Sequence, residues 1–206
     1  AFEEQMDYLY ENGFYTATLD ELQAFLDGEI ILPDKTVVIT FDDGYLSNAL
    51  YAHPIMKKYN FRGTIFMLGY RVDAPQAKFD PSSNQSISIY EAYKYSDVFD
   101  YESHTYELHS LNENGEKLLL VSDKKTIIND LIKSKELLNA KYFAYPYGAY
   151  DEDTIQYIKE TGHEMAFTIK PGYTIKGLNK YELPRFSISP QNMPFNKFKR
   201  IVNGYY

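Results

Sequence analysis

The chain contains no cysteine and no tryptophan, and it has fewer basic than acidic residues. Without cysteine, disulfides, thiol nucleophiles and thiolate metal sites are excluded, so any metal site must use histidine and carboxylate ligands. The 21 Lys and Arg residues against 29 Asp and Glu residues give a net charge of -8. This charge argues against a nucleic-acid partner, because phosphate binding needs a concentrated basic surface. The small basic group of Lys197, Lys199 and Arg200 is better explained as the solvated face of a last helix.

Long hydrophobic runs are also missing. No apolar segment approaches the roughly 20 residues that a membrane-spanning helix needs, and no signal-peptide pattern opens the chain. A length of 206 residues with 44% hydrophobic content suits one domain over residues 1–206, and we expect a monomer. Because a helical pattern begins at once at Phe2, we also expect an N-terminal truncation whose missing part carries an export signal or anchor.

Strand-like and helix-like patterns alternate along the chain. Apolar runs rich in β-branched and aromatic residues predict strands at 36–41, 63–68, 98–102, 142–145 and 165–169. Apolar spacing and capping residues predict helices at 2–10, 18–28, 47–59, 90–96, 124–138 and 151–161. This alternation predicts an α/β fold with a parallel sheet that could close into a barrel, with functional groups at the carboxyl ends of its strands.

Two adjacent carboxylates follow the first predicted strand. Asp42 and Asp43 end the run at 36–41, where like charges a few ångströms apart favour a bound cation or a shared proton. Taken alone, an ordinary Asp-Asp-Gly turn explains this pair equally well.

Two histidines lie on one loop after the third predicted strand. His104 and His109 are close enough in sequence to reach one ion. Two imidazoles and one carboxylate leave open positions for water and substrate, as a catalytic metal site requires. Two exposed loop histidines are the alternative, but the carboxylates at another strand end favour a metal site.

A third segment, Phe-Ala-Tyr-Pro-Tyr-Gly at 143–148, ends the fourth predicted strand. Pro146 and Gly148 bracket Tyr147 and enforce a tight backbone, which can present an N–H group to an oxyanion. A turn that only terminates the strand is the alternative.

In this order, the segments 40–44, 104–109 and 144–148 resemble the motifs of the polysaccharide deacetylases of carbohydrate esterase family 4, defined by the NodB homology domain. The resemblance covers nearly the whole chain. It implies a distorted, incomplete (β/α) barrel of about seven parallel strands. It also implies that Asp43, His104 and His109 bind one divalent metal ion, zinc, with cobalt or nickel as alternatives.

The same resemblance implies the catalytic groups. Asp42 matches the general base, and the backbone N–H of Tyr147 matches the group that binds the oxyanion. Tyr145, Pro146 and Tyr147 are expected to contact the substrate.

Two departures from the common family pattern indicate a particular branch. The histidines are five positions apart instead of four, and Ala144 replaces the usual arginine of the third motif. Both features, and the opening stretch at 2–26, look like the enzymes that N-deacetylate the biofilm polymer poly-β-1,6-N-acetyl-D-glucosamine. The resemblance thus implies an N-acetylated polysaccharide as partner and an extracellular, cell-surface or cell-wall location.

A third departure concerns the general acid. The family places a histidine near the C-terminus, but none follows His163, and His163 and His53 are interpreted as structural. The acid could lie outside this sequence, be a water on the metal or Asp42 itself, or be missing. Arg185 is expected to orient Asp42. Two alternative functions stay open: an impaired deacetylase that only binds carbohydrate, and an O-acetyl esterase acting on xylan or peptidoglycan.

Overall fold

A computed structural model describes residues 1–189 and 193–206 of the chain, which fold into seven short strands with helices between them. The strands are β1 (Tyr15–Thr16), β2 (Thr36–Val37), β3 (Thr40–Phe41), β4 (Gly63–Met67), β5 (Phe99–Ser103), β6 (Tyr142–Ala144) and β7 (Met165–Phe167). β1 pairs with β2, and the other five form one sheet in the order β3-β4-β5-β6-β7, with every pairing parallel. The predicted α/β fold with a curled, incomplete parallel barrel is confirmed.

Helices connect the strands, and most begin and end close to the predicted positions. They are α1 (Phe2–Glu11), α2 (Leu19–Leu26), the π-helical segment η1 (Asn48–Ala52), α3 (His53–Lys58), α4 (Gly69–Val72), α5 (Ile89–Ala92), the 3-10 turn η2 (Tyr93–Tyr95), α6 (Leu118–Val121), α7 (Lys124–Leu138), the 3-10 turn η3 (Pro146–Gly148), α8 (Glu152–Glu160) and α9 (Phe195–Val202). In the part of the chain that the structure describes, none of these helices has the length and apolarity to cross a bilayer.

The single strand predicted at 36–41 is wrong, because the structure divides it into β2 and β3. Val38 and Ile39 carry the chain from the small sheet, where β2 pairs with β1, to the large sheet, where β3 pairs with β4. One apolar run thus contributes a strand to each of two sheets, and the hydrophobic pattern of the run does not show where the pairing partner changes.

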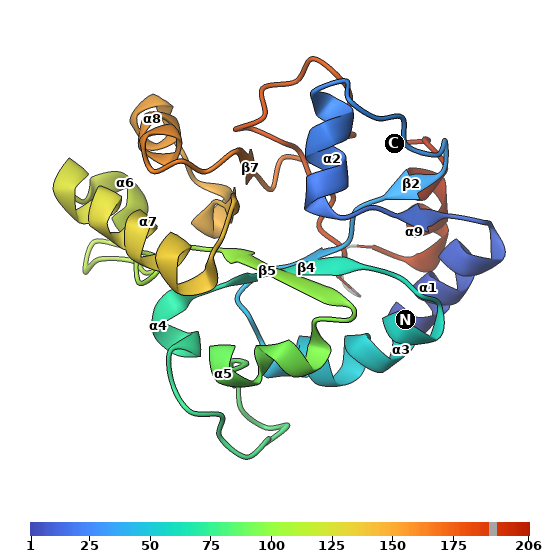
Figure 1. Ribbon diagram of the computed structural model, residues 1–206, viewed down its shortest axis with the longest axis horizontal. Coiled ribbons are helices and arrows are strands. Elements are labelled where there is room, and N and C mark those ends of the chain that lie inside the picture. The colour runs from blue at the N-terminus through green and yellow to red at the C-terminus, as the bar shows by residue number, and fades with distance from the viewer. Residues whose placement is uncertain (190–192) are drawn as a thin grey trace.

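α7 packs beside the sheet, against β5. The Asp123 side chain accepts a hydrogen bond from the Thr126 N–H at 3.0 Å and caps the first turn, while Asn139 ends the helix in a left-handed conformation with φ of 51°. Ile127 and Leu131 are buried on its inner face. Figure 1 shows α6, α7 and α8 together on one side of the molecule, with α1, α2, α9 and both termini on the other.

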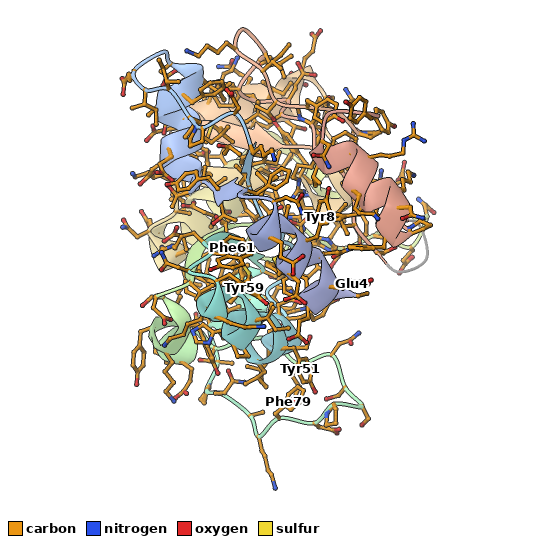
Figure 2. All side chains as sticks on the ribbon, turned by 90° about the vertical axis from the view of Figure 1, so that its right-hand side faces the viewer. Glu4, Tyr8, Tyr51, Tyr59, Phe61 and Phe79 are labelled. Atoms are coloured by element: carbon orange, nitrogen blue, oxygen red, sulfur yellow. The ribbon has the colours of Figure 1, made fainter. Side chains whose placement is uncertain are left out.

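The side formed by α1 is rich in aromatic contacts, as Figure 2 shows. Tyr8 meets the ring of Phe195 in α9 edge-on, at 5.9 Å between ring centres. Farther along this face, Tyr51 of η1 contacts Phe79 of the long loop before α5, at 6.0 Å. Ring packing therefore ties both α9 and this loop to the barrel.

The barrel stays open between its edge strands β3 and β7. Residues after β7 partly fill this seam, because Leu183 forms a parallel bridge with Phe167 and the Arg185 side chain crosses to β3. A mostly apolar cavity of about 890 Å³ lies in the seam, and Asp42 and Arg185 form part of its wall. The seam therefore leads to the strand ends where the polar motifs lie.

Candidate metal centre

The two aspartates lie at the carboxyl end of β3. Asp43 and Gly44 both adopt left-handed conformations, with φ of 70° and 65°, and so end the strand and begin the turn toward η1. A side chain at Gly44 would lie against Met67 of β4. The left-handed backbone at Gly44 favours glycine, and the tight turn brings Asp43 beside the end of the neighbouring strands.

His104 follows β5 directly and is almost fully buried. Its Nδ1 lies 2.7 Å from the carbonyl oxygen of Ala144, which can only accept a hydrogen bond. Nδ1 must therefore carry the proton, which leaves the Nε2 lone pair free for a metal. Burial lowers the pKa of His104, although the Asp42 carboxylate opposes the shift, so the ring is held in its neutral, metal-binding form.

Asp43, His104 and His109 converge on one point. The Oδ1 atom of Asp43 lies 3.5 Å from Nε2 of His104 and 3.4 Å from Nε2 of His109, and this oxygen is buried without a hydrogen-bond partner. Ligand atoms at about 2.0–2.2 Å from a tetrahedral ion are roughly 3.3–3.5 Å apart. Because both distances from Asp43 match, all three ligand atoms lie within 4.8 Å of one another, and the Asp43 oxygen has no other partner, the three residues fit a divalent ion with positions left for water and substrate.

Tyr147 closes the site beside His109. Their ring centres are 4.3 Å apart, and the Tyr147 side chain remains 42% exposed. Its backbone is left-handed, with φ of 57°, and the following Gly148 leaves no room for a side chain because a Cβ would lie 2.3 Å from Ile169. Among the hydrogen bonds of the described residues, none uses the backbone N–H of Tyr147, so this donor is available to a ligand.

Asp42 is paired with Arg185. Two guanidinium nitrogens donate to its two oxygens, each at 2.8 Å, and Arg185 also donates to the Thr40 hydroxyl at 3.1 Å and to the Thr168 carbonyl at 3.0 Å. Burial alone would raise the pKa of Asp42, but the charge and hydrogen bonds of Arg185, together with the charges of His104 and His109, outweigh burial and the pKa is lowered. Arg185 thus holds Asp42 ionised in a fixed orientation, although Ala144 stands where the common motif has arginine.

The structure separates the three residues expected to contact substrate. Tyr145 is fully buried, its hydroxyl donates to the Tyr181 carbonyl at 3.0 Å, and its ring stacks on Tyr150 at 4.8 Å. Pro146 is buried as well. Only the Tyr147 side chain reaches the surface, so the side chains of Tyr145 and Pro146 support the site from below.

The other two histidines lie away from this site. His163 precedes β7 at the opposite end of the sheet, where it is buried against Phe143. His53 of α3 lies 2.7 Å from Asp97, which precedes β5. Neither ring faces the convergence of Asp43, His104 and His109.

Two residues near the site were not identified from sequence. Burial and the neighbouring Asp43 carboxylate raise the pKa of Tyr45. Its only signal in the sequence was its place directly after the Asp-Asp-Gly turn. Asp130, on α7, accepts hydrogen bonds from the loop that carries both histidines. No spacing in the sequence connects a helical aspartate with that loop.

Known proteins are similar to this chain in sequence and in fold. Residues 30–166 match the family named Polysaccharide deacetylase. The poly-beta-1,6-N-acetyl-D-glucosamine N-deacetylase of Staphylococcus aureus is 31% identical over 197 residues, which covers 91% of this chain and 66% of that protein. The chain spans just under two thirds of the length of the curated relatives it matches.

Solved structures of deacetylases are similar to this chain in fold. IcaB from Ammonifex degensii superimposes with a TM-score of 0.81 at 27% identity, covering 98% of this chain and 86% of that one. The deacetylase PplD of Streptococcus pyogenes, solved with acetate, has a TM-score of 0.82 at 20% identity, covering 100% and 85% of the two chains, and this likeness concerns the fold alone. With the family match over most of its length and an open parallel barrel of the same form, this chain belongs to the polysaccharide deacetylase family.

Proposed function

We propose that the chain is a metal-dependent polysaccharide N-deacetylase, and that poly-β-1,6-N-acetylglucosamine is its substrate. The observation that carries the proposal is the convergence of Asp43, His104 and His109 on one point, beside an ionised Asp42. The staphylococcal relative supports this substrate, since it is named for the same polymer. Because this polymer lies outside the cell, the proposal includes a location at the cell surface or in the cell wall.

The candidate metal ligands define the electrophilic part of the site. A divalent ion held by Asp43, His104 and His109, zinc with cobalt or nickel as alternatives, would supply Lewis acidity toward an acetamide carbonyl and toward a water molecule. The protein groups around it perform the proton transfers and bind the developing charge. The Tyr147 N–H donates to the oxyanion that forms when water attacks the acetyl carbon.

Asp42 is the general base in this proposal. Because Arg185 keeps it ionised, Asp42 accepts the proton of the attacking water. When the carbon–nitrogen bond breaks, the sugar nitrogen takes up one proton and becomes the free amine, and acetate leaves as the other product. Two of the four histidines are metal ligands and the other two lie at the far end of the sheet, so we assign the return of this proton to Asp42 as well.

The test is acetate release from β-1,6-linked N-acetylglucosamine oligomers by the wild-type protein and by Asp42→Asn. We expect release by the wild type and a loss of about 10²-fold to 10⁴-fold in the variant, with its metal content retained. Asp97→Asn removes a carboxylate at the far end of the sheet and serves as control. A variant that keeps most of its turnover would remove Asp42 from the base role.

The alternatives give different results in the same assay. Release only from O-acetylated xylan or peptidoglycan fragments would identify an O-acetyl esterase. Bound metal without release from any of these substrates would indicate a carbohydrate-binding module.

A further inference from the structure

The loop between the two histidine ligands has an unusual conformation. Thr105, directly after His104, is fully buried and left-handed, with φ of 76°. A β-branched residue rarely adopts this conformation, which persists only where the surroundings enforce it. The loop must therefore be held by contacts outside itself.

A single carboxylate on α7 supplies the main contact. The Oδ1 atom of Asp130 accepts the Tyr106 N–H at 2.8 Å, and its Oδ2 atom accepts the N–H groups of Glu107 and Leu108 at 2.7 and 3.2 Å. Three successive backbone donors thus point at one charged acceptor, and hydrogen bonds to a charged acceptor are stronger than neutral ones. These donors lie between the two ligands, immediately before His109.

Other contacts clamp the same loop against α4. The N–H of Gly69 donates to the Thr105 carbonyl at 3.0 Å, and that of Tyr70 donates to the Tyr106 carbonyl at 2.9 Å. The Tyr106 ring lies so close to Gly69 that a Cβ there would be 2.4 Å from it, and the Nζ atom of Lys133 on α7 lies over the same ring, 3.5 Å from its centre. The loop is therefore held between α4 and α7.

The two ligands depend on this clamp to different degrees. His104 is fixed by its position at the end of β5 and by the hydrogen bond to the Ala144 carbonyl. For His109, the described residues provide ring contacts with Tyr147 and His104, but no comparable hydrogen bond to a backbone carbonyl. The placement of His109 therefore depends on the backbone that Asp130 holds.

We propose that Asp130 is a positioning residue of the metal centre: its carboxylate fixes the loop so that His109 faces Asp43. The inference rests on the proposed metal site and adds to it a group on a different element that no ligand motif contains.

The experiment compares Asp130→Asn with Asp123→Ala. Asparagine keeps the size of the side chain, but its amide nitrogen cannot accept the hydrogen bonds that a carboxylate oxygen accepts from the backbone N–H groups. Asp123→Ala removes the α7 cap without touching the loop, so it is a control for loss of helix stability. The readouts are the affinity for Co²⁺ and Zn²⁺ by competition with a chromophoric chelator, the visible spectrum of the Co²⁺ protein, and the melting temperature.

We expect Asp130→Asn to bind both ions about 10-fold to 100-fold more weakly and to change the Co²⁺ spectrum, as loss of groups behind metal ligands typically does. Asp123→Ala should lower the melting temperature and leave affinity and spectrum unchanged. Wild-type affinity in Asp130→Asn would overturn the inference. The inference would also be overturned if both variants lost metal affinity in proportion to the decrease in their melting temperatures.

A second variant covers the case in which Asp130→Asn does not fold. Gly69→Ala pushes on the same loop from the α4 side and should also weaken metal binding, and wild-type affinity in this variant would overturn the inference. A wild-type protein that binds neither ion would instead refute the proposed function, and the inference with it.

Discussion

The pairing of Arg185 with Asp42 gives a prediction that does not depend on substrate or metal. Both side chains are only partly exposed, at 16% and 31%, and two contacts of 2.8 Å join them. Two unit charges 4 Å apart attract by about 4 kcal/mol at an effective dielectric constant of 20. Because both ions also lose hydration, we expect a net coupling of about 1–3 kcal/mol.

The assay is a double-mutant cycle by urea unfolding of the metal-free protein at pH 7, with Arg185→Gln, Asp42→Asn and the double variant. Arg185→Gln alone should cost about 2–4 kcal/mol, since it also loses the bonds to Thr40 and Thr168 and leaves Asp42 charged without its partner. Asp42→Asn should then cost much less in the Arg185→Gln background than in the wild type. A coupling below about 0.5 kcal/mol would refute the reasoning.

The pH dependence provides a second check of the same pair. Arg185 lowers the pKa of Asp42 in the folded protein, so this stabilisation is present above the unfolded pKa of about 3.9 and is lost as the pH falls through the lower folded value. The difference between wild type and Arg185→Gln should therefore shrink in acid. A difference that stays constant down to acid unfolding would contradict the charge pairing.

Two buried groups should tilt the stability of the metal-free protein in opposite directions with pH, and urea unfolding of single variants measures both. Burial lowers the pKa of His163 to about 3, so the native state cannot take up the proton that the unfolded chain binds below pH 6.5. Between pH 6.5 and 5 the free energy of unfolding of the wild type should therefore fall by about 2 kcal/mol more than that of His163→Gln. Equal pH dependences of the two proteins would contradict this. Burial raises the pKa of Glu102 to about 8, so between pH 5 and 8 the free energy of unfolding of the wild type should fall by on the order of 3 kcal/mol relative to that of Glu102→Gln. In this variant the amide oxygen can still accept the two backbone N–H groups that Glu102 binds. A difference in stability that does not change with pH would show that Glu102 is ionised in the fold.

The fold could be predicted where a pattern is long or bounded by clear signals. The helix predicted at 124–138 matches α7, and the capping box at Thr18 and Glu21 opens α2 as expected. The short elements β1, α4 and α6 were not predicted, since two to four residues carry no measurable period. These elements form because the rest of the barrel holds them, which is information that a local pattern lacks.

The candidate site divides in a similar way. Asp42, Asp43, His104 and His109 follow strand ends in short motifs, and the structure brings all four together. The contact of Arg185 with Asp42 was also anticipated. The role of Asp130 could not be, because it acts on backbone N–H groups more than 20 positions earlier in the chain, and backbone donors leave no mark in a sequence. The residues of the proposed site could therefore be identified from the sequence, while the residue proposed to position them could not.

The central claim is that Asp43, His104 and His109 hold a metal ion that deacetylation requires. The most direct measurement is the metal content of the purified protein and of His104→Ala by elemental analysis, together with acetate release from β-1,6-linked N-acetylglucosamine oligomers. We predict about one equivalent of a divalent ion in the wild type, with metal and acetate release lost together in the variant. Acetate release by a wild-type protein without metal, or a His104→Ala variant that keeps its metal, would contradict the account.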